Sequence, residues 1–547
     1  MGGLLARASR WVMTPILVKE LRATFRGWRF YAAHGVVLSL FALILLITLI
    51  VWMTEPDPNP SKVGRVVFAM FAVFQAVLVV LVLPAFGCTS VVGEKERKSF
   101  DLLLTTTLTP AEIVWGKFTA TMTYSCLFLI STLPLVSIAF LFGGVSLVDL
   151  GFCYAYLLVS SVLLNLYAVF ISTTVKTSQR GVVICYLFLA PLVIALGALG
   201  VLLAEKYLER LLNGRAAELT FDFENTFEAV LRLGAPAFLY AALLGFFFLS
   251  ATNRLKSPTA NHSTSFRIFY VLLVAGAAWI ALWLMETSPG KMAFHDRLTL
   301  ALAYLYGIGA FGIFSQVFAA EEPVLPLRLR TQVGRMTGVR AALRPMMPGS
   351  VNGAVFCVLV NGLVLAASVL PLWYGVLAPE SFPAPPGVHA EPGSAHELAR
   401  AVPFTAACIF AFLCLLSGAG VLFSTMFRRT STAKGMLGLL LLAVLLVPLI
   451  AWLVVVQDME DGVPKPYGIA VTNLPMALVT VWFGLEQKPI VPFAFNLHGR
   501  SIPYSAAFCG AHVALGLGLF LWGMLRRRRL VQRAELGPTA LAEGAKG

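Results

Sequence analysis

The most distinctive group of side chains lies between residues 94 and 108, where a run of charged residues leads into an apolar segment. The apolar positions recur at the spacing of one face of a short helix. The group consists of Glu94, Lys95, Glu96, Arg97, Lys98, Phe100, Leu103, Leu104 and Leu108. An apolar face at a membrane surface packs either into a groove of a partner protein or against the chain's own inner surface, and both interpretations stand here. These residue types at this spacing indicate a docking surface.

The residues directly after this group predict a sharp helix start. Thr109 is a favourable N-cap, Pro110 fits the first helical position, and Glu112 stands three residues after the cap. This capping-box pattern predicts that a long helix begins at Pro110 and that the preceding segment hangs between two helices.

Motifs for reaction chemistry are absent from the sequence. Residues 93–99 come nearest to the phosphate loop GxxxxGK[ST], but they lack its second glycine and are acidic where phosphate would bind. Neither HExxH nor GxSxG occurs, and the eight cysteines include no CxxC pair. We therefore expect no enzymatic activity, no metal and no cofactor on this chain.

The composition predicts an all-α polytopic membrane protein. Only 12% of the 547 residues are charged, 59% are hydrophobic and the mean hydropathy is +0.83, whereas soluble chains average about 25% charged residues. Twelve segments reach the length of about 20 apolar residues that a membrane helix needs: Phe30–Met53, Val63–Val91, Glu112–Phe142, Leu147–Val175, Gly181–Ala204, Leu233–Ser250, Ile268–Met285, Leu298–Phe318, Val351–Leu377, Val402–Phe427, Gly435–Val456 and Tyr504–Leu525. We expect two six-helix halves, at residues 1–250 and 251–530, and a cytosolic tail at 531–547.

The positions of the 41 Lys and Arg residues give the expected orientation. With the N-terminus inside, most of them fall in inside segments, and most of the 27 Asp and Glu residues fall outside. The run Arg526–Arg529 after the last span is the strongest marker. Both termini are therefore expected in the cytosol, and the net charge of +14 indicates topology in a multi-pass cell membrane protein, with no nucleic-acid partner.

Three further segments are expected to lie at the membrane surface. Residues 14–29 begin with a cap at Thr14 and Pro15 and predict an in-plane amphipathic helix on an anionic leaflet, with an ordinary basic flank of the first span as the alternative. Residues 205–213 predict a short outer-surface helix, and the apolar residues 474–485 are too few to span and predict an interfacial or re-entrant piece. The basic face of the first segment consists of Lys19, Arg22, Arg26 and Arg29.

Two similar junctions indicate a tandem repeat. Ser172 and Thr173 match Ser424 and Thr425, and each pair lies where the fourth span of a half joins the fifth. Between the second and third spans, Glu94 matches Glu321 or Glu322. Parallel repeats are a known transporter architecture, and chance similarity at membrane exits is the alternative interpretation.

The spans themselves are almost free of ionisable residues, which an ion-coupled carrier needs. Their notable polar residues are Gln75, Asn165, Gln316 and Asn361. We expect these four to hydrogen-bond neighbouring helices and not to bind a substrate. Energy for uphill transport would then come from outside this chain.

The stretch from residue 91 to 117, VVGEKERKSFDLLLTTTLTPAEIVWGK, resembles the inner-loop signature of ABC-2-type transporter permeases. Residues 14–22 similarly resemble the elbow helix before span one of these permeases. The positions that match the loop signature are Glu94, Glu96, Asp101, Leu102, Leu103, Leu104, Thr109, Glu112, Ile113, Gly116 and Lys117. The resemblance implies that this loop is a coupling helix and that two copies of a separate ATPase subunit dock beneath the chain and hold the ATP. It also implies a prokaryotic plasma or inner membrane.

Two departures from the family pattern matter. Lys98 and Ser99 replace a turn that usually contains a small residue or glycine. In the second half, Glu321 and Glu322 are followed by two prolines, which break a helix, and then by Arg328 and Arg330. The second coupling element is therefore expected to be degenerate or displaced to residues 327–335.

The expected function is that of the permease subunit of an ABC-2-type exporter, in which one chain supplies both halves or a second permease chain pairs with it. An ion-coupled secondary transporter and a membrane scaffold or assembly protein without transport are the two alternatives.

Overall fold

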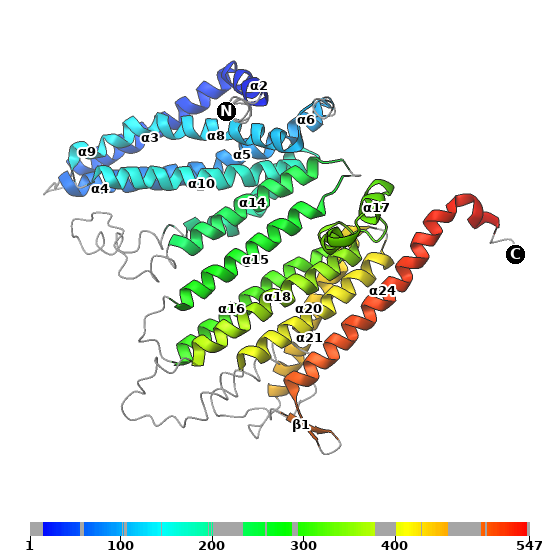
Figure 1. Cartoon of the computed structure of the whole chain (residues 1–547). Coiled ribbons are helices and arrows are strands. Elements are labelled where there is room, and N and C mark those ends of the chain that lie inside the picture. Colours follow the sequence, from blue (N-terminus) through cyan, green and yellow to red (C-terminus); the bar gives the residue numbers. More distant parts are fainter. Residues whose placement is uncertain are drawn as a thin grey trace, which may run out of the picture. The chain divides into compact units, whose positions relative to one another are not determined.

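The computed structural model describes residues 15–54, 60–100, 102, 105, 107–143, 145–194, 196–197, 200, 233–257, 260–286, 294–377, 401–427, 429–457, 494–497 and 500–543. These residues are predominantly helical (Figure 1). They also form one antiparallel hairpin, β1 (Ala494–Leu497) with β2 (Arg500–Pro503), which the prediction of an all-α protein missed. The chain divides into two compact units, Met1–Ser257 (unit 1) and Pro258–Gly547 (unit 2).

Unit 1 contains ten described helices. They are α2 (Pro15–Phe25), α3 (Trp28–Met53), α4 (Pro60–Leu81), α5 (Leu83–Thr89), α6 (Val92–Glu96), α8 (Pro110–Ser137), α9 (Ala139–Phe142), α10 (Leu147–Thr174), α11 (Ser178–Leu187) and α14 (Ala235–Leu255).

Unit 2 contains nine described helices. They are α15 (Ser263–Glu286), α16 (Phe294–Ser315), η2 (Gln316–Phe318), α17 (Leu327–Gly334), η3 (Gly338–Met346), α18 (Ser350–Leu377), α20 (Ala401–Met426), α21 (Thr430–Gln457) and α24 (Tyr504–Glu543).

Nine helices within the described ranges are long and apolar enough to cross a membrane, and each coincides with a predicted span. The other three predicted spans overlap α11, α16 with η2, and α21. Helix α11 is short, and in the other two the apolar stretches that meet the same description are shorter, at Tyr304–Phe318 and Thr430–Ala443. The chain is thus a multi-pass helical membrane protein. The predictions for residues 205–213 and 474–485 lie outside the described residues.

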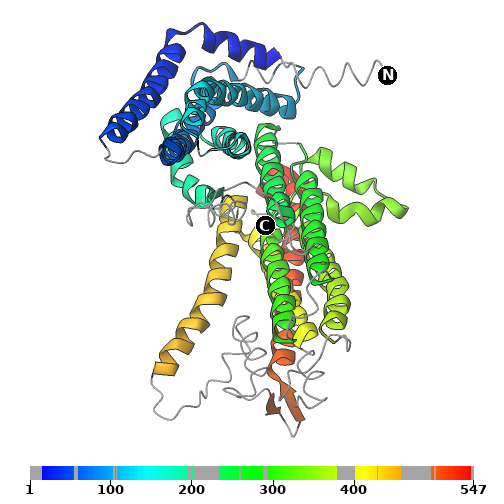
Figure 2. The same cartoon turned by 90° about the vertical axis from the view of Figure 1, so that its left-hand side faces the viewer.

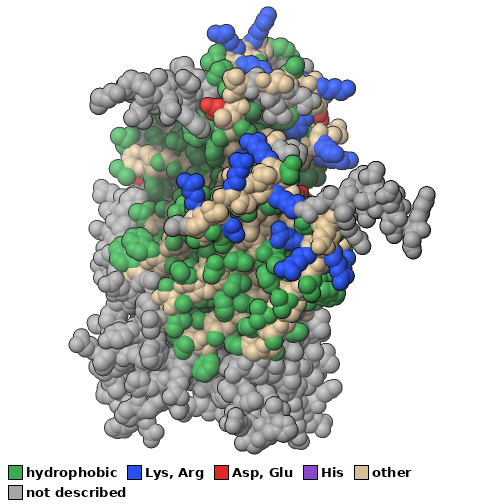
Figure 3. Space-filling view, turned by 45° about the vertical axis from the view of Figure 1, so that its right-hand side comes forward, with side chains coloured by type: hydrophobic (Ala, Val, Ile, Leu, Met, Phe, Trp, Pro, Cys, Tyr) green, Lys and Arg blue, Asp and Glu red, His purple; other side chains and the backbone are tan. Residues whose placement is uncertain are grey.

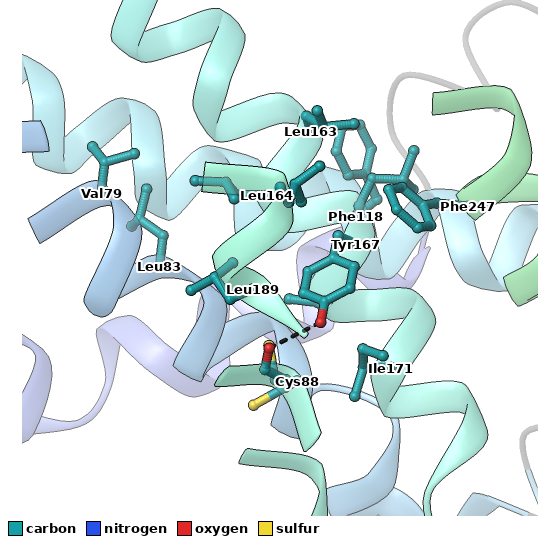
Figure 4. Packing of buried hydrophobic residues seen from close by; sticks show 14 of the residues in the cluster. Val79, Leu83, Cys88, Phe118, Leu163, Leu164, Tyr167, Ile171, Leu189 and Phe247 are labelled. Atoms are coloured by element: carbon teal, nitrogen blue, oxygen red, sulfur yellow. Dashed lines mark hydrogen bonds between the residues drawn. The ribbon is translucent and has the colours of Figure 1, made fainter. Parts of the chain in front are cut away.

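Helix α10 is the centre of unit 1. It packs against α4, α5, α8, α11 and α14, and its Leu163, Leu164 and Tyr167 are almost completely buried. Figure 4 shows these side chains packed with Leu83 of α5 and Phe247 of α14. The Tyr167 hydroxyl donates a hydrogen bond of 2.9 Å to the carbonyl oxygen of Cys185, which satisfies the polar end of an otherwise apolar core.

Helix α20 holds the equivalent place in unit 2. It packs against α16, α18, α21 and α24, as α10 packs against α4, α8, α11 and α14. The first long helices of the two units also have corresponding neighbours. Helix α3 contacts α4 and α8, and α15 contacts α16 and α18. The same order of helices therefore has the same neighbours in both units, which is the arrangement that the predicted tandem repeat requires.

The contact between α20 and α24 depends on glycine. A methyl group added at Gly418 would overlap the carbonyl oxygen of Gly516, and one added at Gly516 would lie 2.6 Å from the carbonyl oxygen of Cys414. The two backbones approach closely only because both positions lack a side chain.

We predict that Gly418→Ala destabilises the protein by about 1–3 kcal/mol, because the added methyl group forces the two backbones apart. The measurement is the thermal unfolding of the full chain in detergent. Gly438→Ala in α21 is the matched control, since nothing lies within 4 Å of the position where its methyl group would be added. Equal midpoints for the two variants would contradict the close packing.

Candidate functional site

The sequence group around residue 94 folds into the short helix α6 and the turn that ends it. Lys98 follows the helix with a φ of 56°, in the left-handed region that favours glycine. The amide of Ser99 donates to the carbonyl oxygen of Glu94, and the amide of Lys98 donates to that of Lys95, each at 3.1 Å. These two bonds form a Schellman motif, in which glycine is the usual residue at the position of Lys98. The departure noted in the sequence therefore falls on the one residue of this turn whose backbone favours glycine.

Glu94 is the centre of an ion network that joins three helices. One of its carboxylate oxygens lies 2.9 Å from the ammonium of Lys19 on α2 and 2.9 Å from that of Lys117 on α8. The Lys117 ammonium also lies 2.6 Å from the carboxylate of Glu20. Lys117 is only 1% exposed, so its charge depends on these two carboxylates. Helices α2, α6 and α8 are therefore held together electrostatically.

Glu96 and Lys95 bind the junction between α10 and α11. The carboxylate of Glu96 accepts hydrogen bonds from the backbone amide and the hydroxyl of Ser178, at 2.7 and 2.5 Å, and so caps the start of α11. The ammonium of Lys95 donates to the carbonyl oxygen of Thr173 at 2.6 Å, near the end of α10. In return, the Ser172 hydroxyl accepts hydrogen bonds from the backbone amides of Val91 and Val92, each at 2.9 Å.

These contacts bring together two motifs that the sequence presented separately. The charged run after the second span and the Ser172 junction after the fourth span cap one another's helix ends. The prediction identified both motifs but not their contact, since about 80 residues separate them along the chain. The residue types gave a usable signal, because a carboxylate suits a helix start and an ammonium suits a helix end.

The described part of the predicted apolar face is turned inward. Phe100 and Leu108 pack against a buried cluster that includes Ile16 of α2 and Ile113 of α8, and the Lys95 ammonium lies 5.7 Å from the centre of the Phe100 ring. Of the two interpretations of this face, packing on the chain's own surface therefore holds for these two residues. Leu103 and Leu104 lie outside the described residues.

The side chains that face outward here are different ones. Leu102 is 71% exposed, although the sequence analysis gave it no docking role. Arg97 and Lys98, five and four residues earlier, are also exposed, whereas Glu94, a predicted coupling residue, lies largely inside the ion network. Arg97 and Lys98 thus stand exposed directly after residues that are bound to α2, α8, α10 and α11.

The predicted amphipathic helix at residues 14–29 is shorter than expected. Helix α2 ends at Phe25, and α3 begins at Trp28, since Gly27 interrupts the helical hydrogen bonding. Ile16 is buried against the chain itself, and the Thr24 hydroxyl hydrogen-bonds the Tyr124 hydroxyl at 2.6 Å. The structure shows Lys19 paired with Glu94, Arg22 and Arg26 exposed, and Arg29 in α3, while Thr14 and the side chain of Arg29 lie outside the described residues.

Unit 2 has a matching carboxylate at Glu321. It accepts a hydrogen bond from Arg267 of α15 at 2.7 Å and one from the backbone amide of Gly349, just before α18, at 2.9 Å. The Arg267 side chain is fully buried and lies over the rings of Phe318 and Phe356. Of the two predicted counterparts of Glu94, Glu321 is therefore the one that pairs with a buried cation.

The remaining second-half candidates lie apart from this pair. Glu322 is exposed, and Arg328 and Arg330 are exposed on α17. Helix α17 starts at Leu327, directly after Pro326, and ends before Arg335. A helix therefore lies within residues 327–335, where a displaced second element was expected, and whether it couples to a partner stays a prediction.

The four polar residues of the spans all contact protein groups. Gln75 donates to the Thr132 hydroxyl at 2.8 Å, and Asn165 donates to the Ser125 hydroxyl at 2.7 Å. The side chain of Gln316 accepts from Ser417 at 2.7 Å, and that of Asn361 donates to Ser315 at 2.9 Å. Each of these bonds joins two separate elements, as predicted for helix–helix contacts.

Comparison of the chain with known protein families finds no match. No curated protein matches it either.

We predict that Lys98→Gly stabilises the protein by about 0.5–1 kcal/mol, because it relieves the left-handed conformation of a residue with a side chain. Denaturant unfolding of the full chain in detergent measures the change. The control is Lys98→Ala, which keeps the conformational cost and is expected to give no gain. A gain that is equal for both variants would show that the charge and not the backbone is responsible.

We predict that Lys117→Met destabilises the chain by about 3–5 kcal/mol, since it leaves the carboxylates of Glu94 and Glu20 without their buried cation. The matched control is Lys19→Met in the same network. The side chain of Lys19 is 61% exposed, so its loss costs less than about 1 kcal/mol. Thermal unfolding of both variants compares them, and a loss for Lys117→Met as small as that for Lys19→Met would refute the importance of the network.

Proposed function

We propose that this chain is the membrane-spanning permease subunit of an ABC-2-type exporter in a cell membrane. In this proposal a separate ATPase subunit docks on the segment from Arg97 to Leu102, and two copies of that subunit serve one transporter. The ATP is bound and hydrolysed on the partner, and this chain moves the cargo.

The observation that carries the proposal is the way in which one small exposed segment is fixed to several helices. Arg97 and Leu102 are exposed, whereas the three residues directly before Arg97 are bound. Lys95 and Glu96 bind the junction between α10 and α11, and Glu94 binds helices α2 and α8. When this segment is displaced, these helices are therefore expected to move with it. A surface for receiving motion from a partner needs this combination of access and rigid attachment.

The turn at Lys98 gives further support. The family pattern has a glycine-containing turn here, and the backbone of Lys98 adopts the conformation that favours glycine. This backbone conformation at Lys98 supports the resemblance of residues 91–117 to the permease loop.

The test is co-purification of the tagged full-length chain from its native membrane in mild detergent. We predict that an ATP-hydrolysing subunit accompanies the wild-type chain and that the double variant Arg97→Glu with Leu102→Asp loses it at least tenfold, because the variant places two negative charges on the docking surface. Both residues are exposed, so the fold is expected to be retained.

The matched control is Leu147→Asp. Leu147 is 75% exposed in the first turn of α10, at the end of that helix remote from Ser172. An aspartate is favourable in the first turn of a helix, so the control should keep the ATPase subunit. Absence of any ATPase from the wild-type complex, or its retention by the double variant, would refute the proposal. Native mass spectrometry of the complex distinguishes one permease chain from two.

A further inference from the structure

The segment between the second and third long helices of unit 2 is strongly basic. No Asp or Glu occurs between Pro323 and Gly349. The segment contains five arginines, all of them exposed: Arg328, Arg330, Arg335, Arg340 and Arg344. Such a density of one charge on a short surface element indicates an anionic partner.

The fold presents this segment as a hairpin of α17 and η3. Figure 2 shows the two helices extending sideways from the long helices of the same unit. Helix η3 packs against α15 and α18, and Leu329 and Met347 are buried as anchors. Leu327 and Leu343 are instead 76% and 56% exposed, so apolar side chains lie among the arginines on the outer surface.

A second arginine group joins the hairpin from α24. The Arg527 guanidinium donates to the carbonyl oxygen of Pro323 at 2.9 Å, across 204 residues of sequence. Arg330 lies near enough to Arg527 for their charges to interact. We call the five hairpin arginines and Arg526–Arg529 the arginine platform.

Within the described residues, three arginines of the platform lack the carboxylate partners that a buried and an exposed lysine of unit 1 have. Lys19 and Lys117 meet Glu94 and Glu20, whereas no carboxylate within the described part of the chain pairs with Arg328, Arg335 or Arg340. Glu321, the nearest acidic residue that is not exposed, is already paired with Arg267. An anion from outside the chain would therefore lower the repulsion within the platform.

The position of the platform relative to the bilayer identifies that anion. Exposed Leu521, Trp522 and Leu525 of α24 come directly before Arg526. Tryptophan followed by arginine is typical of the boundary between the acyl chains and the headgroups of a bilayer. Figure 3 shows a band of Lys and Arg side chains bordering a broad surface of hydrophobic side chains.

We propose that the arginine platform binds the headgroups of anionic phospholipids. Guanidinium groups bind phosphate oxygens in a two-point geometry, and Leu327 and Leu343 are placed to insert at the acyl boundary. The platform thus anchors unit 2 to lipid. Its hairpin follows the second long helix of unit 2, as α6 follows the second long helix of unit 1. This inference does not rest on the proposed function, because lipid binding needs no ATPase.

The experiment is native mass spectrometry of the full-length chain in neutral detergent, titrated with phosphatidylglycerol or with phosphatidylcholine of the same acyl chains. We predict at least tenfold tighter binding of phosphatidylglycerol. The triple variant Arg328→Gln, Arg335→Gln and Arg340→Gln should lose about 100-fold of that affinity, since each arginine near an anionic surface contributes about fivefold. The corresponding Arg→Lys variant keeps the charge but loses the two-point contacts, so it should bind phosphatidylglycerol more tightly than the Gln variant and more weakly than the wild type.

The control variant removes three positive charges elsewhere, by Arg65→Gln, Lys176→Gln and Arg180→Gln, and should bind phosphatidylglycerol like the wild type. Equal binding of the two lipids, or equal loss in the two Gln variants, would overturn the proposal. Competition by millimolar inorganic phosphate would indicate a soluble anion site instead. Loss of a co-purifying ATPase with unchanged lipid binding would assign the platform to a protein partner and would also overturn the proposal.

Discussion

A carboxylate at the end of the second long helix holds the neighbouring elements of each unit together. In unit 1, Glu94 joins Lys19 of α2 to Lys117 of α8. In unit 2, Glu321 joins Arg267 of α15 to the backbone amide before α18. Because Lys117 and Arg267 are almost completely buried, separating these elements would leave a charge without water and without a partner. In unit 1 this interaction couples α2, α6 and α8, and in unit 2 it couples α15 to the start of α18.

The two units differ in what they expose beside this shared interaction. Unit 1 presents Arg97 and Leu102 on a short segment that is capped onto the junction of α10 and α11. In unit 2 the helical path ends at Phe318. Two prolines follow Glu322, and α17 forms only after the second of them, Pro326. Beside comparable carboxylates, unit 1 thus carries a small, firmly held surface and unit 2 a broad group of arginines. A protein partner suits the first, and a charged lipid surface suits the second.

Much of the fold followed from hydropathy and from local helix signals. The capping box at Thr109 formed as predicted, with the Glu112 carboxylate 2.7 Å from the backbone amide of Thr109. Such signals depend on residues a few positions apart, so a sequence displays them directly. The break at Gly27 was missed, because the amphipathic pattern continues through it while the backbone does not.

The candidate site was predictable in place but not in detail. Periodicity placed Phe100 and Leu108 on one face of a helix, yet it does not specify whether a partner or the chain itself covers that face. The role of Lys117 was missed because its two carboxylates come from segments far away in the sequence. Arg267 offered a signal, as a charged residue at the edge of a predicted span, and such residues need a partner.

The most direct test of the account places a photo-crosslinking amino acid at position 102 of the full-length chain in its native membrane. The account predicts a crosslink from this position to an ATP-hydrolysing subunit, and none from the same label at position 147. Crosslinks from position 102 only to lipid, or only within the chain itself, would contradict the claim that this segment receives the motion of a partner.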